Sequence, residues 1–551
     1  MTTFMDKLVT LWPEMIMLAG AVACMGVGLA SSSAVRRSTP WVAAAAMVAA
    51  WVVTVFTPVA DHPLGFGGMV PYVKCLVLAM GLILLAVNAG VPEALSQQLD
   101  VERKADTSKG FDPAESVSGE FYGFFLLSLT GAMMVASATD LVWLFLALEL
   151  TSLPTYVMIA TSRHRLAAQE SAIKYFFLGA LSAAVFLYGF ALIYGATGFT
   201  DFGRIAASVE ADVSPLMLLG VVLAVLGLCF KVAAVPMHVY AADVYQGAAT
   251  PVTAFLAVVP KTAGFVALIL VVGLVGWDTG AGGLPAALAY LLAGIAVLTM
   301  TIGNVLAIIQ SDLKRVLAYS SIAHSGYLMC GLVAGLAPTA AVTEGSSGGV
   351  PGGAMGNGVA AVLFYLLGYG MATAGAFAVL ACLRPKQDAD ADDGDGDADT
   401  LGYDALSGLW WKRPALAGVM LVSMLSLVGM PPLAGFLGKV YLIGGVFTAG
   451  YAVLAVVIVL NSAISAGYYL RIAMVCFFGP RNDAVAATRA PWRVAAGVLT
   501  TLAAFALGGY AADGIVSRSH DAVTPGAVEK EASIDATTQS AAAASPRRPS
   551  R

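Results

Sequence analysis

Charged residues are scarce in this chain of 551 residues. They make up 11% of the sequence, against about 25% in an average soluble domain, whereas 59% of the residues are hydrophobic. The mean hydropathy is +0.83, and apolar runs of roughly 20 residues recur along most of the length. No soluble domain of useful size fits between these runs. The composition therefore excludes a soluble enzyme and predicts an all-α polytopic membrane protein.

Paired cysteines and nucleotide-binding motifs are also missing. The six cysteines are scattered singly, and no C-x-x-C pair indicates an iron–sulfur cluster or a structural zinc ion. We expect them to be small apolar packing residues. The sequence contains neither a P-loop nor a G-x-G-x-x-G that opens a βαβ unit. We therefore expect no cofactor, no metal and no nucleic acid to bind to this chain itself.

The apolar runs predict about fourteen transmembrane helices. Their expected positions are near 8–30, 41–60, 71–90, 121–139, 141–160, 171–196, 216–235, 250–274, 286–309, 315–337, 356–383, 414–447, 451–479 and 491–512. Lysine and arginine concentrate in the odd-numbered connections, for example Arg36 and Arg37 in the first, whereas the even-numbered ones hold almost nothing basic except Arg204. By the positive-inside rule, the odd connections are cytoplasmic and both termini lie outside.

The order of these spans predicts five regions and two inverted repeats. The regions are an N-terminal three-helix segment with a cytoplasmic loop at 1–120, a first repeat at 121–274, a second repeat at 286–479 with an acidic loop at 384–413, a last transmembrane helix at 491–512 and a disordered tail at 513–551. Each repeat contains five helices with a break in the fourth. Sets with an odd number of helices in tandem have opposite orientations. The acidic run at 388–399 lacks the ligand pattern of a calcium loop, so we expect a solvated linker.

One stretch, 226–265, combines membrane-like hydropathy with residues that break helices. It carries Lys231 and Lys261 without basic neighbours, and Pro236 and Asp243 lie between them. Charged residues at membrane depth are costly and usually functional, and an unwound segment there exposes backbone groups that can hold water. This pattern predicts an ion pathway and not a membrane anchor.

Two further charges fall at membrane depth. Glu149 lies about nine residues into its span, roughly 13 Å deep at about 1.5 Å per residue, so it should be paired or protonated. Lys439 follows a second predicted break at Pro431 and Pro432. A Glu–Lys pair that opens and closes would switch the proton affinity of its lysine.

We hypothesise that protons move along a chain of intramembrane residues, with a histidine that connects it to the cytoplasmic side. The candidates are Glu149, Lys231, Lys261, Lys439 and His238.

Structural explanations remain open for these residues. A static ion pair between Glu149 and Lys231 would only fix helix packing, and His238 would be a core histidine bound to freed backbone groups. Lys174 is expected to snorkel towards the cytoplasmic surface. Asp243 is expected to stabilise the turn of the broken helix.

Several stretches resemble one known family. HVYAADVYQGAATPVTAFLAVVPKTAGF resembles the H-x-W-x-x-D-V-Y-x-G-A-P-x-P-V-T-A-F stretch of subunit N of bacterial proton-translocating NADH–quinone oxidoreductase, which is respiratory complex I. Further matches are ESAIKYFFLGALSAAVFLYG, GNVLAIIQSDLKRVLAYSSIAHSGYL and LVGMPPLAGFLGKVYL. Together these matches cover most of the chain, about 121–479. The family is one of three antiporter-like subunits in the membrane arm.

The resemblance implies a multi-pass subunit of a proton pump in a bacterial inner (plasma) membrane. Electron transfer from NADH to quinone would drive it, with the flavin, the iron–sulfur clusters and the quinone in partner subunits. Its expected partners are neighbouring antiporter-like subunits and the lipid bilayer. The family's essential ionisable positions map onto Glu149, Lys231, Lys261 and Lys439, and His238 falls on a family position too.

Three other functions remain open at this point. The first is a subunit of a multisubunit cation/proton antiporter, which shares this fold and would depend on sodium. The second is a related membrane complex fed by ferredoxin or another donor. The third is a purely structural arm subunit whose lysines only pack.

Overall fold

The computed structural model describes most of the chain. The described residues are 9–30, 32–58, 62–91, 113–162, 166–209, 213–277, 284–336, 356–385, 401–481, 485–487, 490–509 and 512–523. The acidic run at 388–399 and the tail beyond residue 523 lie outside these described residues.

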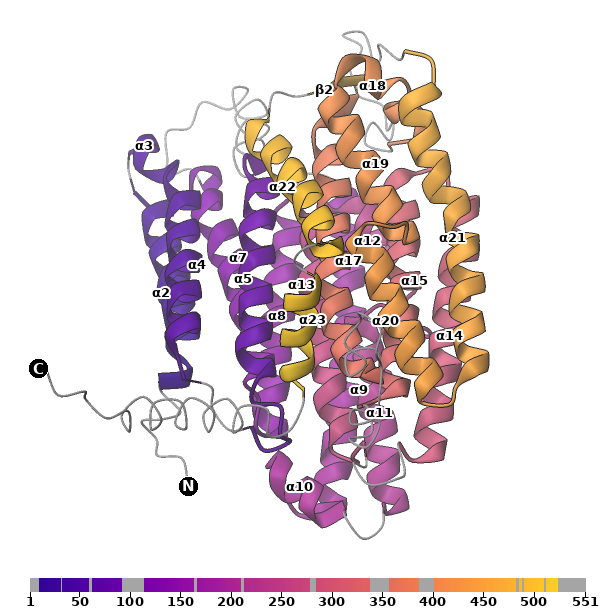
Figure 1. Cartoon of the computed structure of the whole chain (residues 1–551). Coiled ribbons are helices and arrows are strands. Elements are labelled where there is room, and N and C mark those ends of the chain that lie inside the picture. Colours follow the sequence, from indigo (N-terminus) through magenta and orange to yellow (C-terminus); the bar gives the residue numbers. More distant parts are fainter. Residues whose placement is uncertain are drawn as a thin grey trace, which may run out of the picture.

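Long helices that run roughly parallel to one another form the molecule (Figure 1). The N-terminal helices are α2 (Trp12–Gly28), α3 (Ser33–Arg36), α4 (Thr39–Phe56) and α5 (Met69–Asn88). The next set comprises α7 (Pro113–Ala136), α8 (Leu141–Ala160), α9 (Leu166–Thr197), α10 (Phe202–Val209), α11 (Pro215–Lys231), α12 (Ala241–Gly247) and α13 (Thr250–Gly273).

The second half has the same character. Its elements are α14 (Ala286–Ile309), α15 (Leu313–Ala334), α17 (Gly358–Ala381), β1 (Leu383–Pro385), η2 (Tyr403–Leu406), α18 (Leu409–Lys412), α19 (Pro414–Val428), α20 (Ala434–Thr448), α21 (Ala452–Phe478), β2 (Val485–Ala487), α22 (Pro491–Gly508) and α23 (Ala512–Asp521). The two short strands pair antiparallel and join two connections at one end of the molecule.

The described helices confirm a helical multi-pass membrane protein. Eleven of them are long and apolar enough to cross a membrane by length and composition, and α2, α11, α19 and α20 are shorter apolar helices. The number of fourteen spans stays a prediction. In each predicted repeat, the fourth of the five spans is broken, as the prolines predict. The first repeat breaks between α11 and α12, and the second breaks between α19 and α20.

The second helix of each set begins in the same way. Asp140 caps α8 by accepting from the backbone N–H of Trp143, and Asp312 caps α15 by accepting from that of Arg315. Each aspartate also forms an isolated β-bridge with the segment that follows the third helix, to Asp201 in one set and to Gly402 in the other. The two bridges lie at opposite ends of the molecule, beside α10 and on the side of α18 (Figure 1), as an inverted repeat requires.

Helices α13, α15 and α17 form the centre of the molecule. They are almost entirely buried inside the protein, whereas α9 and α21 expose much of their surface. α13 packs against α11 and α17, and α17 in turn packs against α19, α20 and α22. Polar side chains on the three central helices are therefore shielded from water and lipid by protein, and any charge there must find its partner within the bundle.

Three buried charges that the sequence analysis did not single out, those of Glu14, Lys74 and Arg493, link the N-terminal helices to one another and to the rest of the bundle. Lys74 of α5 lies 2.8 Å from Glu14 of α2, both side chains are 3% exposed, and Ser137 donates to Glu14 at 3.2 Å. At the other end of α5, Arg493 of α22 donates to the backbone oxygens of Val87, Ala89 and Ala381.

The chain does not lose its order where we predicted the tail to begin. α23 occupies Ala512–Asp521 and packs against α5 and α17, and Ala522 and Val523 beyond it are buried. The prediction of a tail from residue 513 is therefore wrong for residues 513–523. Polar side chains made this segment look disordered, but its small and apolar residues pack on the bundle.

Removing one partner of the Glu14–Lys74 pair should destabilise the protein. Glu14→Ala leaves a buried ammonium group without its carboxylate, which typically costs about 3–5 kcal/mol. The double variant Glu14→Leu/Lys74→Met removes both charges and should recover most of that loss. Thermal unfolding in detergent measures both. Equal loss in the single and double variants would contradict the expectation.

Candidate functional site

The first break brings Glu149 and Lys231 together. Lys231 is the last residue of α11, and its Nζ lies 3.2 Å from Glu149 Oε1 and donates to Ser152 Oγ at 2.6 Å, both on α8. The Lys231 side chain is 2% exposed and that of Glu149 is 20% exposed. The pairing expected for Glu149 is therefore present, and its carboxylate is the more accessible of the two groups.

Other helices satisfy the unwound backbone of this break. Ala233 has a positive φ of 55°, so the helix cannot continue through it. Ser325 donates its hydroxyl to the backbone oxygen of Val232, and the N–H of Val235 donates to Thr299 Oγ1 at 3.0 Å. Irregular backbone is tolerated at membrane depth because such groups find partners inside the protein.

Lys261 lies at the centre of the fully buried helix α13. Its Nζ donates to the backbone oxygen of Ser321 at 2.5 Å and to Ser321 Oγ at 2.6 Å. The hydroxyl of Tyr369 donates to the same Ser321 Oγ at 2.8 Å, and the Tyr369 ring centroid lies 5.0 Å from the amine. Within the described part of the chain Lys261 forms no ion pair, so neutral oxygens and an aromatic ring stabilise it.

Lys439 binds the end of a helix. Its Nζ donates to the backbone oxygens of Leu427 at 3.0 Å and Val428 at 2.7 Å, which are the last residues of α19, and to Ser462 Oγ at 2.8 Å. The carbonyl end of a helix carries partial negative charge and favours a cation. The second break thus creates the binding site for the lysine that follows it.

A buried histidine that the sequence analysis did not identify lies between these two lysines. His324 Nδ1 is 2.7 Å from the hydroxyl of Tyr365, and its Nε2 is 2.9 Å from that of Tyr469. Its ring centroid is 5.0 Å from that of Tyr369 and 5.6 Å from that of Tyr327.

The same two tyrosine rings face the lysines. Tyr369 lies 5.0 Å from the Lys261 amine, and Tyr327 lies 5.0 Å from the Lys439 amine. Lys261, Tyr369, His324, Tyr327 and Lys439 therefore form a continuous series of neighbours through the core.

The two repeats place different chemistry at matching positions. Glu149 lies nine residues after the capping Asp140, and Ser321 lies nine residues after the capping Asp312. Each of them contacts a buried lysine, Lys231 or Lys261. The first repeat thus offers a carboxylate to Lys231, whereas the second repeat offers a hydroxyl to Lys261, which is itself a residue of the first repeat.

The two lysine sites of the first repeat meet at a glycine. A Cβ at Gly264, one turn after Lys261, would lie 3.0 Å from Lys231 Cβ and 2.7 Å from Val232 Cγ1. Only a residue without a side chain lets α13 approach the end of α11 this closely.

His238 does not join this group directly. It lies half-buried in the turn between α11 and α12, and no hydrogen bond between His238 and either Lys231 or Lys261 is found among the described residues. The signal that could have indicated His324 is its place inside an apolar run, in SSIAHSGYL, where a lone imidazole needs partners.

Comparison with known proteins agrees with this architecture. The model of the family described as NADH:quinone oxidoreductase/Mrp antiporter, TM, matches residues 138–344 and 351–465. NADH-quinone oxidoreductase subunit N of Myxococcus xanthus is 37% identical over 516 residues, which cover 90% of this chain and 94% of the relative. The chain belongs to the subunit N family of NADH–quinone oxidoreductases. Subunit N of Trichlorobacter lovleyi is 42% identical over 371 residues, or 66% of this chain and 69% of the relative.

Solved structures extend the likeness beyond subunit N. A chain of respiratory complex I from Thermus thermophilus with bound aureothin matches with a TM-score of 0.68 and 31% identity, covering 90% of this chain and 96% of that chain. A chain of the Mrp complex from Dietzia sp. DQ12-45-1b matches with a TM-score of 0.70, covering 96% of this chain and 99% of that chain. At 18% identity, the second match shows the fold alone.

Substitution of Gly264 should disturb the contact between α11 and α13. Gly264→Ala forces Val232 or the helix to move, and overpacking of this kind costs about 1–3 kcal/mol. Gly467→Ala in α21 is the matched control, because its added Cβ would meet no atom of the described residues within 4 Å. We expect Gly264→Ala to lower the thermal stability of the purified protein and Gly467→Ala to leave it unchanged. Equal stabilities for the two variants would show that the close approach is unimportant.

Proposed function

We propose that this chain is the proton-translocating subunit N of the membrane arm of an NADH–quinone oxidoreductase. Electron transfer from NADH to quinone takes place in other subunits, which hold the flavin, the iron–sulfur clusters and the quinone. Neighbouring antiporter-like subunits and the lipid bilayer surround the chain in a bacterial inner membrane, with both termini outside.

The placement of His324 between Lys261 and Lys439, with the rings of Tyr369 and Tyr327 next to all three, carries this proposal. His324 is placed to pass a proton in either direction, because a neutral imidazole has one nitrogen that donates and one that accepts. Its two nitrogens meet the hydroxyls of Tyr365 and Tyr469, and a serine hydroxyl, Ser320, also contacts Tyr469. Hydroxyls both donate and accept, so each can hand on the proton it receives.

The buried lysines supply the stored charge. Lys261 and Lys439 hold their ammonium groups with neutral oxygens, so the loss of a proton leaves no carboxylate unpaired. Removal of an ammonium charge from a site of low dielectric also weakens the repulsion felt by the next cation along the series. Movement of one proton therefore favours movement of the next.

The Glu149–Lys231 pair is placed to control entry into this series. The carboxylate stabilises the ammonium form of Lys231, so opening of the pair would release a proton from the lysine. Gly264 brings the main chain of α13 against Lys231, one turn from Lys261. We further propose that His238, in the turn beyond Lys231, connects this end of the series to the cytoplasmic side.

Substitution of Lys261 should abolish most of the proton transport. Lys261→Ala removes the charge at the centre of the series, and the loss of a positioned proton-transfer group is worth on the order of 10²-fold in rate. Lys412→Ala is the matched control, since Lys412 is an exposed lysine in α18, away from the lysines of the core. The measurement is NADH-driven proton uptake by inverted membrane vesicles, normalised to assembled complex. Normal transport by Lys261→Ala would refute the proposal, and a requirement for sodium would favour the antiporter function.

The two histidines should differ in importance. His324→Gln breaks the contact with two tyrosine hydroxyls in the core, so we expect on the order of 10²-fold slower proton transport. His238→Gln removes a half-buried group outside the series and should slow transport less. The same vesicle assay at several pH values compares them. A larger defect for His238→Gln would place the main route through the turn and not through the core.

A further inference from the structure

The half-helix α12 connects the two lysine sites of the first repeat. Tyr240 precedes it and donates its hydroxyl to the backbone oxygen of Phe230 at 2.8 Å, directly before Lys231. Tyr245, within α12, has its hydroxyl 3.4 Å from the Ser321 hydroxyl that binds Lys261. A shift of α12 would therefore change the surroundings of both lysines at once.

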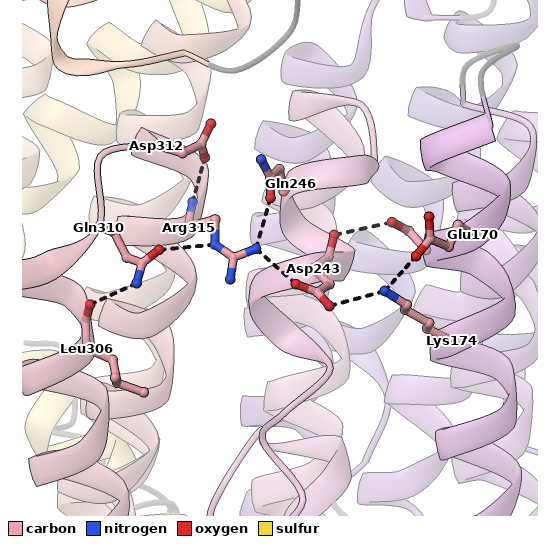
Figure 2. A network of polar contacts seen from close by, with 9 residues as sticks. Glu170, Lys174, Asp243, Gln246, Leu306, Gln310, Asp312 and Arg315 are labelled. Carbon is pink, nitrogen blue, oxygen red and sulfur yellow. Dashed lines mark hydrogen bonds and ion pairs between the residues drawn. The ribbon is translucent and has the colours of Figure 1, made fainter. Parts of the chain in front are cut away.

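A single carboxylate on α12 joins this half-helix to a helix on each side. Asp243 Oδ1 lies 2.9 Å from Nη1 of Arg315 on α15, and its Oδ2 lies 3.3 Å from Nζ of Lys174 on α9. Figure 2 shows Asp243 between these two cations. On the α9 side, Ser171 also donates to the backbone oxygen of Asp243 at 3.2 Å.

The side facing α15 has the larger number of contacts. Arg315 donates from Nη1 to Gln246 Oε1 at 2.9 Å and from Nε to Gln310 Oε1 at 3.1 Å (Figure 2). Lys314 donates to the backbone oxygen of Gln246 and, at 3.3 Å, to that of Ala248. A cation at these carbonyls complements the C-terminal end of α12.

α15 is also the helix that supplies the acceptors of the core. Ser321 and His324 lie six and nine residues after Arg315 on the same helix. The bond between Asp243 and Arg315 therefore fixes α12 to the element that holds Lys261 in place. Exposed ion pairs usually add little stability, so the importance of this pair lies in geometry.

We propose that Asp243 and Arg315 are positioning residues for proton transfer between Lys231 and Lys261. Together they hold α12 against α15, so that Tyr245 stays beside Ser321 and Tyr240 stays beside Phe230. This proposal rests on the proposed function of the lysines. It assigns no proton to Asp243 or Arg315 themselves.

The test uses the assembled complex in inverted membrane vesicles. The variants are Asp243→Asn, Asp243→Glu, Arg315→Lys and the double variant Asp243→Asn/Arg315→Lys, with Glu170→Gln as the matched control. Glu170 contacts Lys174 at 2.7 Å and does not touch Arg315, so its loss removes a nearby charge and leaves the contact with α15 intact. The measurements are NADH-driven proton transport per assembled complex and the solvent deuterium isotope effect on that rate.

We expect Asp243→Asn to slow proton transport on the order of tenfold, because small misplacements of reacting groups have large effects on rate. The isotope effect should rise, since proton transfer becomes the slow step. Asp243→Glu should restore most of the rate, the double variant should be no slower than the slower single variant, and Glu170→Gln should match the unmodified protein.

Other results would overturn the proposal. Normal transport by Asp243→Asn, alongside a defect in Lys261→Ala, would remove the role of Asp243 and leave the proposed function standing. A slow Asp243→Asn variant with an unchanged isotope effect and no rescue by Asp243→Glu would indicate structural damage alone. If Asp243→Asn does not assemble, Arg315→Lys decides the matter, because it retains the charge and loses the planar group that also binds Gln246 and Gln310. Normal transport by both Arg315→Lys and Lys261→Ala would reject the proposed function as well.

Discussion

The cost of holding an ammonium group away from water governs this structure. A buried charge is tolerated only where acceptors are supplied in the right places, and each buried lysine meets this requirement differently. Lys231 has a carboxylate, Lys261 has a serine hydroxyl and a carbonyl, and Lys439 has the open end of a helix. The helices that supply these acceptors must therefore be held at positions that keep the hydrogen bonds to the lysines within their normal distances.

One helix, α15, contacts several of the elements that surround these lysines. Its side chains bind the half-helix α12, the lysine of α13, the unwound backbone after Lys231 and two tyrosines of the second repeat. Because a helix moves as a rigid unit, a displacement of α15 at one of these contacts also displaces its side chains at the other contacts. This arrangement suits a protein in which protonation at one site has to influence the next.

The broken helices supply groups that an intact helix would consume. An α-helix uses its own carbonyls internally, but the end of α19 leaves those of Leu427 and Val428 open for Lys439. At the first break, hydroxyl groups from α14 and α15 satisfy the freed backbone. The helix break of the second repeat thus binds the cation of Lys439. The helix break of the first repeat forms a turn, held by hydroxyl groups, beside the Glu149–Lys231 pair.

The sequence alone determined the membrane-spanning character, both helix breaks, three buried lysines and the partly buried Glu149, since hydropathy and proline are local properties that can be read along the chain. Tertiary structure decided the partners. Lys261 and Ser321 are 60 residues apart, Glu149 and Lys231 are 82 apart, and no local pattern says which helix faces meet. The sequence analysis missed His324 and the Glu14–Lys74 pair because each lies in or beside an apolar run, where the average hydropathy hides a single polar residue. Which side chains bind each buried charge depends on which helix faces pack together, and hydropathy along the chain gives no information about that packing.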